Sequence, residues 1–189
     1  MTNMICDGIG KGYLVKVNSD HQMHVAAVNV TMEHYVNHQY AEAYNIIWDM
    51  SVTSGSDVCT LYILNTGNRT LILEGFSAQV SADITVYAKF GVTGTPGNVT
   101  DMEAGNLNAG SGNVLSATTL QGDGITGLSG GRVVWKSKVP GSNQSGFVNF
   151  DADLIIPSQQ TMTVYATSTI NWTSVGFFIG YVVPNGGNI

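Results

Sequence analysis

The sequence predicts an all-β protein, a jelly-roll-like β-sandwich preceded by an extended N-terminal arm. From Ile46 to the end, eight short apolar runs alternate with turns rich in Gly, Asn and Ser. One long polar connection divides these runs into four and four, and eight strands in two facing sheets are the strand count of a jelly roll. The 189 residues suffice for one such domain, residues 46–189, and for an arm, residues 1–45.

The arm begins with a glycine-rich segment that differs from the rest of the chain. The residues there that we expect to make assembly contacts are Gly8, Gly10, Lys11, Gly12 and Tyr13. Two runs suited to strands, at 13–17 and 23–30, flank a turn at 18–20 and predict a hairpin or an extended arm. A weak helical period between 31 and 45 predicts a short helix there.

The eight sandwich strands follow from apolar runs between turn residues. The first four are Ile47–Thr53, Val58–Leu64, Leu71–Val80 and Ile84–Gly91. The other four are Arg132–Val139, Gly146–Ile156, Thr161–Thr167 and Val175–Val183. Thr85, Tyr87 and Lys89 alternate with apolar neighbours, as expected for a strand with one buried face. Gly, Pro, Asn and Ser mark the turns between the runs.

The long connection between the two sets of strands covers residues 92–131. It contains many glycines and few strong apolar runs. An irregular loop of about forty residues is uncommon inside a compact domain, so we expect either a functional loop or hidden short strands. The segment 114–120 is a candidate for one such strand.

The charge of the chain excludes some partners. Charged residues make up 11% of the sequence, against about 25% in an average domain, and the net charge is −6. Nucleic-acid binding needs clustered Lys and Arg, so we expect no nucleic acid, and we interpret Lys136 and Lys138 as a solvated strand face. No apolar run approaches the length of a membrane span, so we expect no membrane partner. No secretory signal follows Met1, which predicts synthesis in a cytoplasm.

The two cysteines, Cys6 and Cys59, are far apart in the sequence. They could form a disulfide, but Cys59 lies within the apolar run 58–64. A cysteine in such a run behaves as a small apolar residue, so we favour a buried, reduced thiol.

Two glycine-rich strings match motifs of enzyme sites in their letters. Residues 122–127 fit the dinucleotide pattern G-x-G-x-x-G, and residues 127–131 fit the nucleophile elbow G-x-S-x-G. Both motifs need a following helix, and the elbow needs a later histidine, but all four histidines precede Ser129. We therefore expect a glycine-rich loop, no enzyme and no cofactor.

The four histidines lie close together in the arm. His34 and His38 are four residues apart and would share one face of a helix, a spacing that suits a metal ion. No H-E-x-x-H pattern accompanies them, so we interpret them as polar residues of an exposed or inter-subunit arm and expect no metal site. If the arm packs against a neighbouring subunit, these imidazoles would make assembly sensitive to pH between about 5 and 8.

Two carboxylate pairs and the tryptophans bear on other functions. Asp151 with Asp153, and Asp101 with Glu103, resemble acid pairs that hydrolyse glycosides or bind Ca²⁺, but no further oxygen ligands accompany them, so we expect surface charges. Trp135 shares a predicted face with Val133, which indicates the core. Trp172 lies at a predicted turn and could be exposed, as in a sugar-binding platform.

The N-terminal string DGIGKGYLVKVNSDHQMH at 7–24 resembles the opening of virion structural proteins of tailed bacteriophages. The strings LYILNT at 61–66, LILEG at 71–75 and GITGLSGG at 124–131 are similar to that group as well. This resemblance implies a capsid decoration (cement) or head-associated protein with no catalytic residues. It also implies a homotrimer that binds the major capsid protein on the exterior of the virion, after synthesis in the cytoplasm of the host bacterium.

Two other functions remain open at the level of the sequence. One is a receptor- or carbohydrate-binding sandwich on a tail, collar or head fibre, with residues 92–131 as its recognition surface. The other is a glycosidase that uses Asp151 and Asp153. If the protein keeps every activity after alanine replaces both carboxylates, the glycosidase hypothesis is wrong.

Overall fold

The computed structural model describes residues 4–6, 12–14, 32–141 and 146–183. The chain forms two compact units, residues 1–31 and residues 32–189. In the first unit, β1 (Met4–Cys6) pairs antiparallel with β2 (Gly12–Leu14). This hairpin begins earlier than the sequence predicts, and the predicted strand at 23–30 lies outside the described residues.

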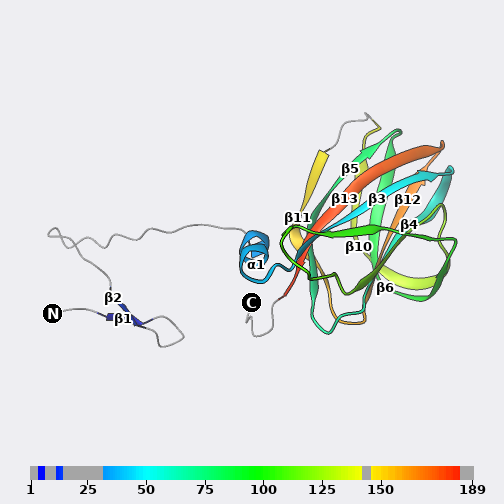
Figure 1. Cartoon of the computed structure of the whole chain (residues 1–189). Coiled ribbons are helices and arrows are strands. Elements are labelled where there is room, and N and C mark those ends of the chain that lie inside the picture. Colours follow the sequence, from blue (N-terminus) through cyan, green and yellow to red (C-terminus); the bar gives the residue numbers. More distant parts are fainter. Residues whose placement is uncertain (1–3, 7–11, 15–31, 142–145, 184–189) are drawn as a thin grey trace. The chain divides into compact units, whose positions relative to one another are not determined.

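The second unit is a sandwich of two antiparallel sheets (Figure 1). The five-stranded sheet has the order β11, β5, β13, β3, β8. Its strands are β3 (Ala43–Val52), β5 (Leu71–Val80), β8 (Glu103–Asn106), β11 (Gly146–Ile156) and β13 (Trp172–Val182). The six-stranded sheet has the order β10, β6, β12, β4, β9, β7. Its strands are β4 (Gly55–Asn65), β6 (Ile84–Gly97), β7 (Thr100–Asp101), β9 (Ala117–Gln121), β10 (Thr126–Val139) and β12 (Thr161–Ser168).

The eight long strands connect the two sheets in the manner of a jelly roll. Strands β3, β5, β11 and β13 form one sheet and β4, β6, β10 and β12 the other, and the chain crosses between sheets at every step except from β6 to β10. The predicted all-β, jelly-roll-like sandwich is therefore confirmed. In the described part of the chain, no helix is long and apolar enough to cross a membrane.

The connection at 92–131 contains the hidden strands rather than a free loop. β8 pairs with β3, and β9 pairs with both β4 and β7, so this segment widens both sheets. β9 (117–121) overlaps the candidate strand at 114–120. The segment is therefore not an irregular loop, because most of it is held by ladder hydrogen bonds, and its role as a recognition surface stays a prediction.

The glycine-rich strings at 122–131 cover the turn before β10 and the ribbon that the start of β10 forms with the end of β6. Gly94 and Gly127 have φ values of 117° and 75°, and a Cβ on Gly94 would collide with the Gly127 carbonyl oxygen. These glycines let two backbones approach where a side chain would not fit. Strand follows strand here without a helix, so neither string has the strand-to-helix context that its motif requires.

The helix α1 (Met32–Tyr40) confirms the predicted short helix and belongs to the second unit. Its Val36 is completely buried and packs with Ala43, Ile72 and Tyr181 of the five-stranded sheet. Residues 32–45, which the sequence assigns to the arm, are thus a helix on the sandwich and the start of β3. The boundary between the two compact units lies after residue 31 instead of 45.

The core lies between the sheets and is rich in aromatic rings. Phe76 contacts Trp135, Phe150 and Phe178 at ring-centroid distances of 5.4, 5.8 and 6.1 Å. Burying one such side chain stabilises a fold by about 1.5–3 kcal/mol. This cluster joins β5, β10, β11 and β13 and so holds both sheets together.

Two expectations about the tryptophans need correction. Trp172 is only 4% exposed, because β13 begins at this residue and directs the indole into the core. Trp135 packs against the core as expected, but Val133 is 49% exposed. A register shift between Val133 and Trp135 puts the two side chains on different faces.

Candidate functional site

The predicted assembly residues belong to separate units. Gly8, Gly10 and Lys11 lie outside the described residues, and the side chain of Tyr13 does as well, although Gly12 and Tyr13 form part of β2. His34 and His38 lie on α1 in the second unit. These residues are therefore not brought together into one site by the fold of either unit.

His38 is exposed, and its Nδ1 lies 2.9 Å from Nε2 of Gln39. The His34 side chain lies outside the described residues. Among the side chains that the structure describes, no group of three or more His, Cys, Asp or Glu gathers as a metal site would require. The pH-sensitive role of the two histidines stays a prediction.

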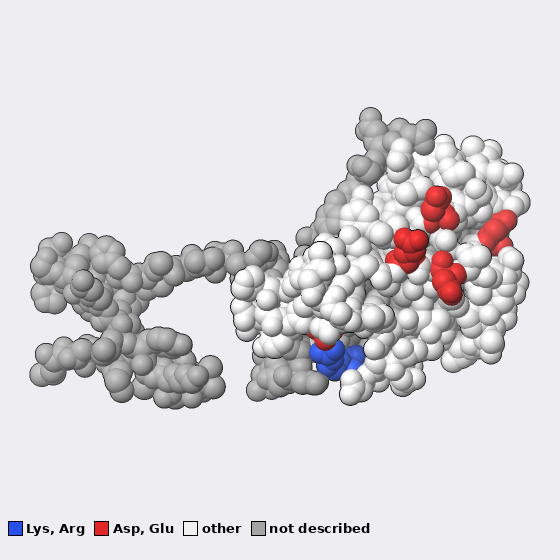
Figure 2. Space-filling view, in the orientation of Figure 1, with Lys and Arg blue, Asp and Glu red and all other residues white. Residues whose placement is uncertain are grey.

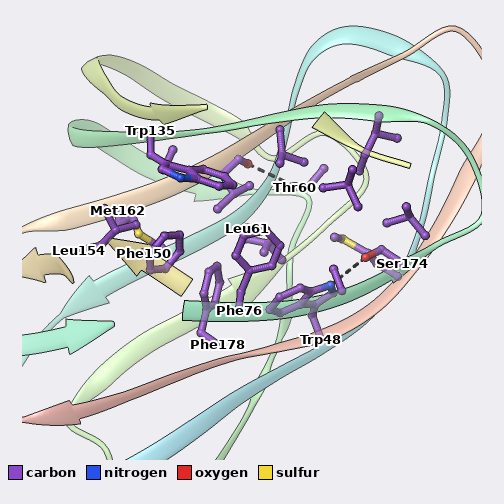
Figure 3. A pocket seen from close by; sticks show the side chains of 18 residues that line it. Trp48, Thr60, Leu61, Phe76, Trp135, Phe150, Leu154, Met162, Ser174 and Phe178 are labelled. Atoms are coloured by element: carbon purple, nitrogen blue, oxygen red, sulfur yellow. Dashed lines mark hydrogen bonds between the residues drawn. The ribbon is translucent and has the colours of Figure 1, made fainter. Parts of the chain in front are cut away.

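The space between the sheets is a packed core. Its cavity has a volume of about 40 Å³, and side chains from both sheets point into it (Figure 3). The polar groups there are engaged, since Trp48 Nε1 donates to Ser174 Oγ at 3.0 Å and Thr60 Oγ1 to the Val164 carbonyl at 3.3 Å. A site for a small organic molecule needs roughly 300 Å³ or more, so this interior does not hold one.

The outer face of the five-stranded sheet carries exposed apolar side chains beside carboxylates. Val175 and Ile47 are 50% and 41% exposed, and Phe177 is partly exposed. Strand pairing puts Asp49 opposite Val175, and Glu103 opposite Ile47. We call the surface formed by Ile47, Asp49, Glu103, Val175 and Phe177 the acidic face.

Further carboxylates surround the acidic face. Asp101 is exposed on β7, and Asp123 accepts hydrogen bonds from the backbone N–H and Oγ1 of Thr53 at 2.9 and 2.7 Å. The backbone N–H of Asp49 donates to Oε1 of Gln121, which ties β3 to the end of β9. In the view of Figure 2, acidic side chains gather on the sandwich, and basic ones are seen only near its lower margin.

The basic residues gather elsewhere. Arg69 forms a 2.7 Å ion pair with Glu42, and the other Lys and Arg residues that the structure describes all lie on β6 and β10. We call five exposed residues at 132–138 of β10 the basic edge; they are Arg132, Val133, Val134, Lys136 and Lys138. β10 is the end strand of its sheet, with β6 on one side. The sequence predicted a solvated strand face that contains Lys136 and Lys138. It missed the apolar part of the same surface, Val133 and Val134.

The polar side chains of a cluster on the outer face of the six-stranded sheet bind one another. Tyr87 donates a 2.6 Å hydrogen bond to Asp57, and its ring stacks on Tyr165 at 5.4 Å. Lys89 Nζ lies 4.1 Å from the Tyr165 ring centroid. Burial, followed by Asp57, raises the pKa of Tyr87, and burial raises the pKa of Tyr165 to about 12. Both phenols stay neutral at pH 7, and their rings already contact each other and the Lys89 ammonium.

Cys59 is buried and free, as predicted. Burial raises the pKa of its thiol from 9.0 to about 11, with smaller opposing effects of Tyr165 and Lys89. Only the thiolate reacts with electrophiles, so a two-unit shift reduces the reactive fraction at about pH 8 roughly a hundredfold. Because the folded-state pKa is raised, this group also favours the fold below about pH 9 and loses that contribution as the pH rises towards 11.

Native protein carrying Cys6→Ser should therefore react with iodoacetamide roughly a hundredfold more slowly than the same chain in denaturant, as followed by mass spectrometry. The Cys59→Ser protein, which keeps Cys6, serves as the matched control. A native rate equal to the unfolded rate would show that Cys59 is accessible.

The side chains considered for sugar binding or hydrolysis do not form a site in the described residues. Asp101 and Glu103 are exposed surface charges, as predicted, and Asp151 and Asp153 have side chains outside the described residues. Trp48 and Trp172 are buried, and Trp135 packs against the core. A signal for the acidic face did exist in the sequence: residues 175–182 are apolar on both strand faces.

No protein-family model matches this chain, and neither a curated protein nor a solved structure matches it. Three of the strings that carry the resemblance to phage proteins lie in or next to strands, whereas the string at 7–24 lies outside the described residues except for 12–14. LYILNT and LILEG lie in β4 and β5, apart from a turn residue, and GITGLSGG lies in the ribbon at the start of β10. The fold explains why the residues of these three strings occur where they do, so residues with a function have to be sought on the surface.

Proposed function

We propose that this chain is a non-enzymatic structural protein of a tailed-phage virion, which decorates and stabilises the exterior of the capsid as a homo-oligomer. The observation that carries the proposal is the apolar part of the acidic face, where Val175 and Ile47 are half-exposed on a regular sheet. Phe177 pairs with Ile47 and follows Val175 by two residues on the same strand face, so the three side chains are neighbours. Apolar surface shared by neighbouring side chains marks protein–protein contact. The virion and the major capsid protein enter the proposal through the resemblance of residues 7–24 to phage virion proteins.

The two-unit organisation supports attachment at more than one point. The first unit contains the β1–β2 hairpin, a structure that can add to a sheet edge of a neighbouring protein through backbone hydrogen bonds. Joining a second binding unit to the first converts its binding into an intramolecular step and strengthens attachment without new chemistry. A homotrimer on a symmetry axis of the capsid would multiply these contacts further.

Deletion of residues 1–31 should weaken binding to capsid shells by about tenfold or more while the sandwich stays folded. The deletion ends before α1, because removing residues 1–45 would also remove Val36 and the start of β3. Co-sedimentation with emptied shells measures affinity, and thermal unfolding monitors the sandwich. The unaltered full-length chain is the control. Unchanged affinity of the truncated protein would show that the arm is not an anchor.

The location in the particle is tested by quantitative mass spectrometry of purified virions. A fixed, simple ratio of this chain to the major capsid protein is expected for a decoration protein. A copy number far below that of the capsid protein would favour the tail, collar or fibre alternative, and a glycan array would then test carbohydrate binding. Absence from particles would refute the proposal.

A further inference from the structure

We infer that the acidic face of one copy of this chain binds the basic edge of a second copy, so that subunits associate head to tail. This inference rests on the proposed function in that it treats the chain as an oligomer, and it specifies the contact. The partner of the acidic face is the basic edge of a second copy of this chain.

The two surfaces match in composition. Each combines half-exposed apolar side chains with charges of a single sign. On the acidic face, Val175 lies beside Asp49, and Ile47 lies between Phe177 and Glu103. On the basic edge, Val133 and Val134 are 49% and 42% exposed and are flanked by Arg132 and Lys136. An apolar centre with a charged margin is the usual composition of a protein interface.

The two surfaces lie on opposite sides of the sandwich. Trp135 of β10 contacts Phe150 of β11 at 5.4 Å, so the basic edge lies on the β11 side. Asp49 of β3 bonds Gln121 of β9 through its backbone, and β8 and β9 lie at the other side of the sheets. The acidic face and the basic edge therefore point away from each other, and a single chain cannot bring them together.

This placement determines the symmetry of the assembly. A two-fold dimer through either surface would oppose like charges, which is unfavourable. Contact between two different surfaces is heterologous, and it closes into a ring when the rotation per subunit allows. A ring of three would be the homotrimer that the resemblance implies.

The form of β10 favours contact through side chains. An open edge strand invites unlimited pairing with other strands, and proteins restrict this with lysines and bulges. β10 has both, since Lys136 and Lys138 follow the register shift between Val133 and Trp135. Its cations are therefore positioned to bind a preformed acidic surface more readily than to extend a sheet.

Charge reversal in the full-length protein tests the assignment. Asp49→Lys/Glu103→Lys gives a chain with two basic surfaces, and Lys136→Glu/Lys138→Glu gives one with two acidic surfaces. Each variant should self-associate at least about tenfold more weakly than the unaltered chain in sedimentation velocity. Association of the unaltered chain should also weaken between about 0.05 and about 0.5 M NaCl, because salt screens exposed charges.

The matched control combines all four changes in one chain, whose net charge remains the −6 of the natural sequence. This variant should associate again, because its surfaces are complementary with reversed signs. Mixing the two double variants should produce hetero-oligomers. Near-UV circular dichroism of each variant confirms the fold.

Three results would overturn the inference. They are a monomer at every concentration for the unaltered chain, association that survives both double reversals, and failure of the fourfold exchange to restore it. The proposed function has a separate readout, the copy number in virions. A chain abundant on particles but monomeric alone would leave the decoration role standing and refute the head-to-tail contact.

Discussion

Replacement of Gly176 by alanine is expected to destabilise the sandwich by about 3 kcal/mol, the upper part of the range for overpacking. Gly176 is buried in the middle of β13, between Trp48 on β3 and Ala78 on β5. A Cβ there would collide with the Ser77 carbonyl oxygen and with the Trp48 ring. The Ser77 carbonyl cannot move away because it belongs to the backbone of the sheet. The Trp48 indole cannot move away because it is buried and hydrogen-bonded to Ser174.

The matched control is Gly105→Ala on β8. A Cβ at Gly105 meets nothing within 4 Å, and the residue lies in an exposed strand. Urea unfolding should show Gly105→Ala within about 0.5 kcal/mol of the unaltered chain, as for surface substitutions in general. Equal stability of the two variants would mean that β13 does not pack against Trp48 as described.

Asn65→Asp is expected to cost about 3–5 kcal/mol at neutral pH, because it leaves a buried charge without a partner. Asn65 is 3% exposed at the end of β4. Its Nδ2 donates to the carbonyls of Arg69 and Ile156 at 2.7 and 2.8 Å, and its Oδ1 accepts from the Gly67 N–H at 3.1 Å. A carboxylate would keep only the last bond and would repel both carbonyls.

The effect of Asn65→Asp should depend on pH. A carboxyl group buried between two carbonyls holds its proton more tightly in the folded than in the unfolded state. Stability is therefore best preserved below the unfolded pKa of about 4, and it falls as the pH rises. Denaturation at about pH 4 and about pH 7.5 measures the difference.

Asn113→Asp is the control for this pH dependence. Asn113 also donates its amide to two backbone carbonyls, of Tyr40 and Ala41, but it is exposed and water can replace those bonds. Its stability should change little at either pH. Equal losses for the two variants would show that burial of Asn65 is not the cause.

The sequence predicted the long strands because their apolar runs are continuous. It could not predict β7, where Thr100 and Asp101 are both polar and exposed and pairing with β9 alone defines the strand. It placed Trp172 in a turn because Asn171 precedes it, although the strand starts at the indole itself. It misjudged Val133 because a bulge shifts the phase of the side chains, and composition does not reveal bulges.

The surfaces depend on pairing between distant parts of the chain. Asp49, Glu103 and Val175 become neighbours only when β3 lies between β8 and β13. No local spacing in the sequence encodes that arrangement. The lysines of β10 were visible as a pair, but their relation to a complementary surface needs the order of strands in both sheets.

The position of β13 has a consequence for how the protein reaches its native state. This strand lies between β3 and β5, yet it is synthesised more than 90 residues after β5 ends at Val80. While the ribosome is still making the preceding segments, β3 and β5 lack the strand that joins them. Such non-local pairing makes folding slow and leaves strand edges unprotected meanwhile. The sandwich should therefore form late, after residue 182 has left the ribosome. Until then, the main risk is that its unpaired strand edges pair with neighbouring nascent chains.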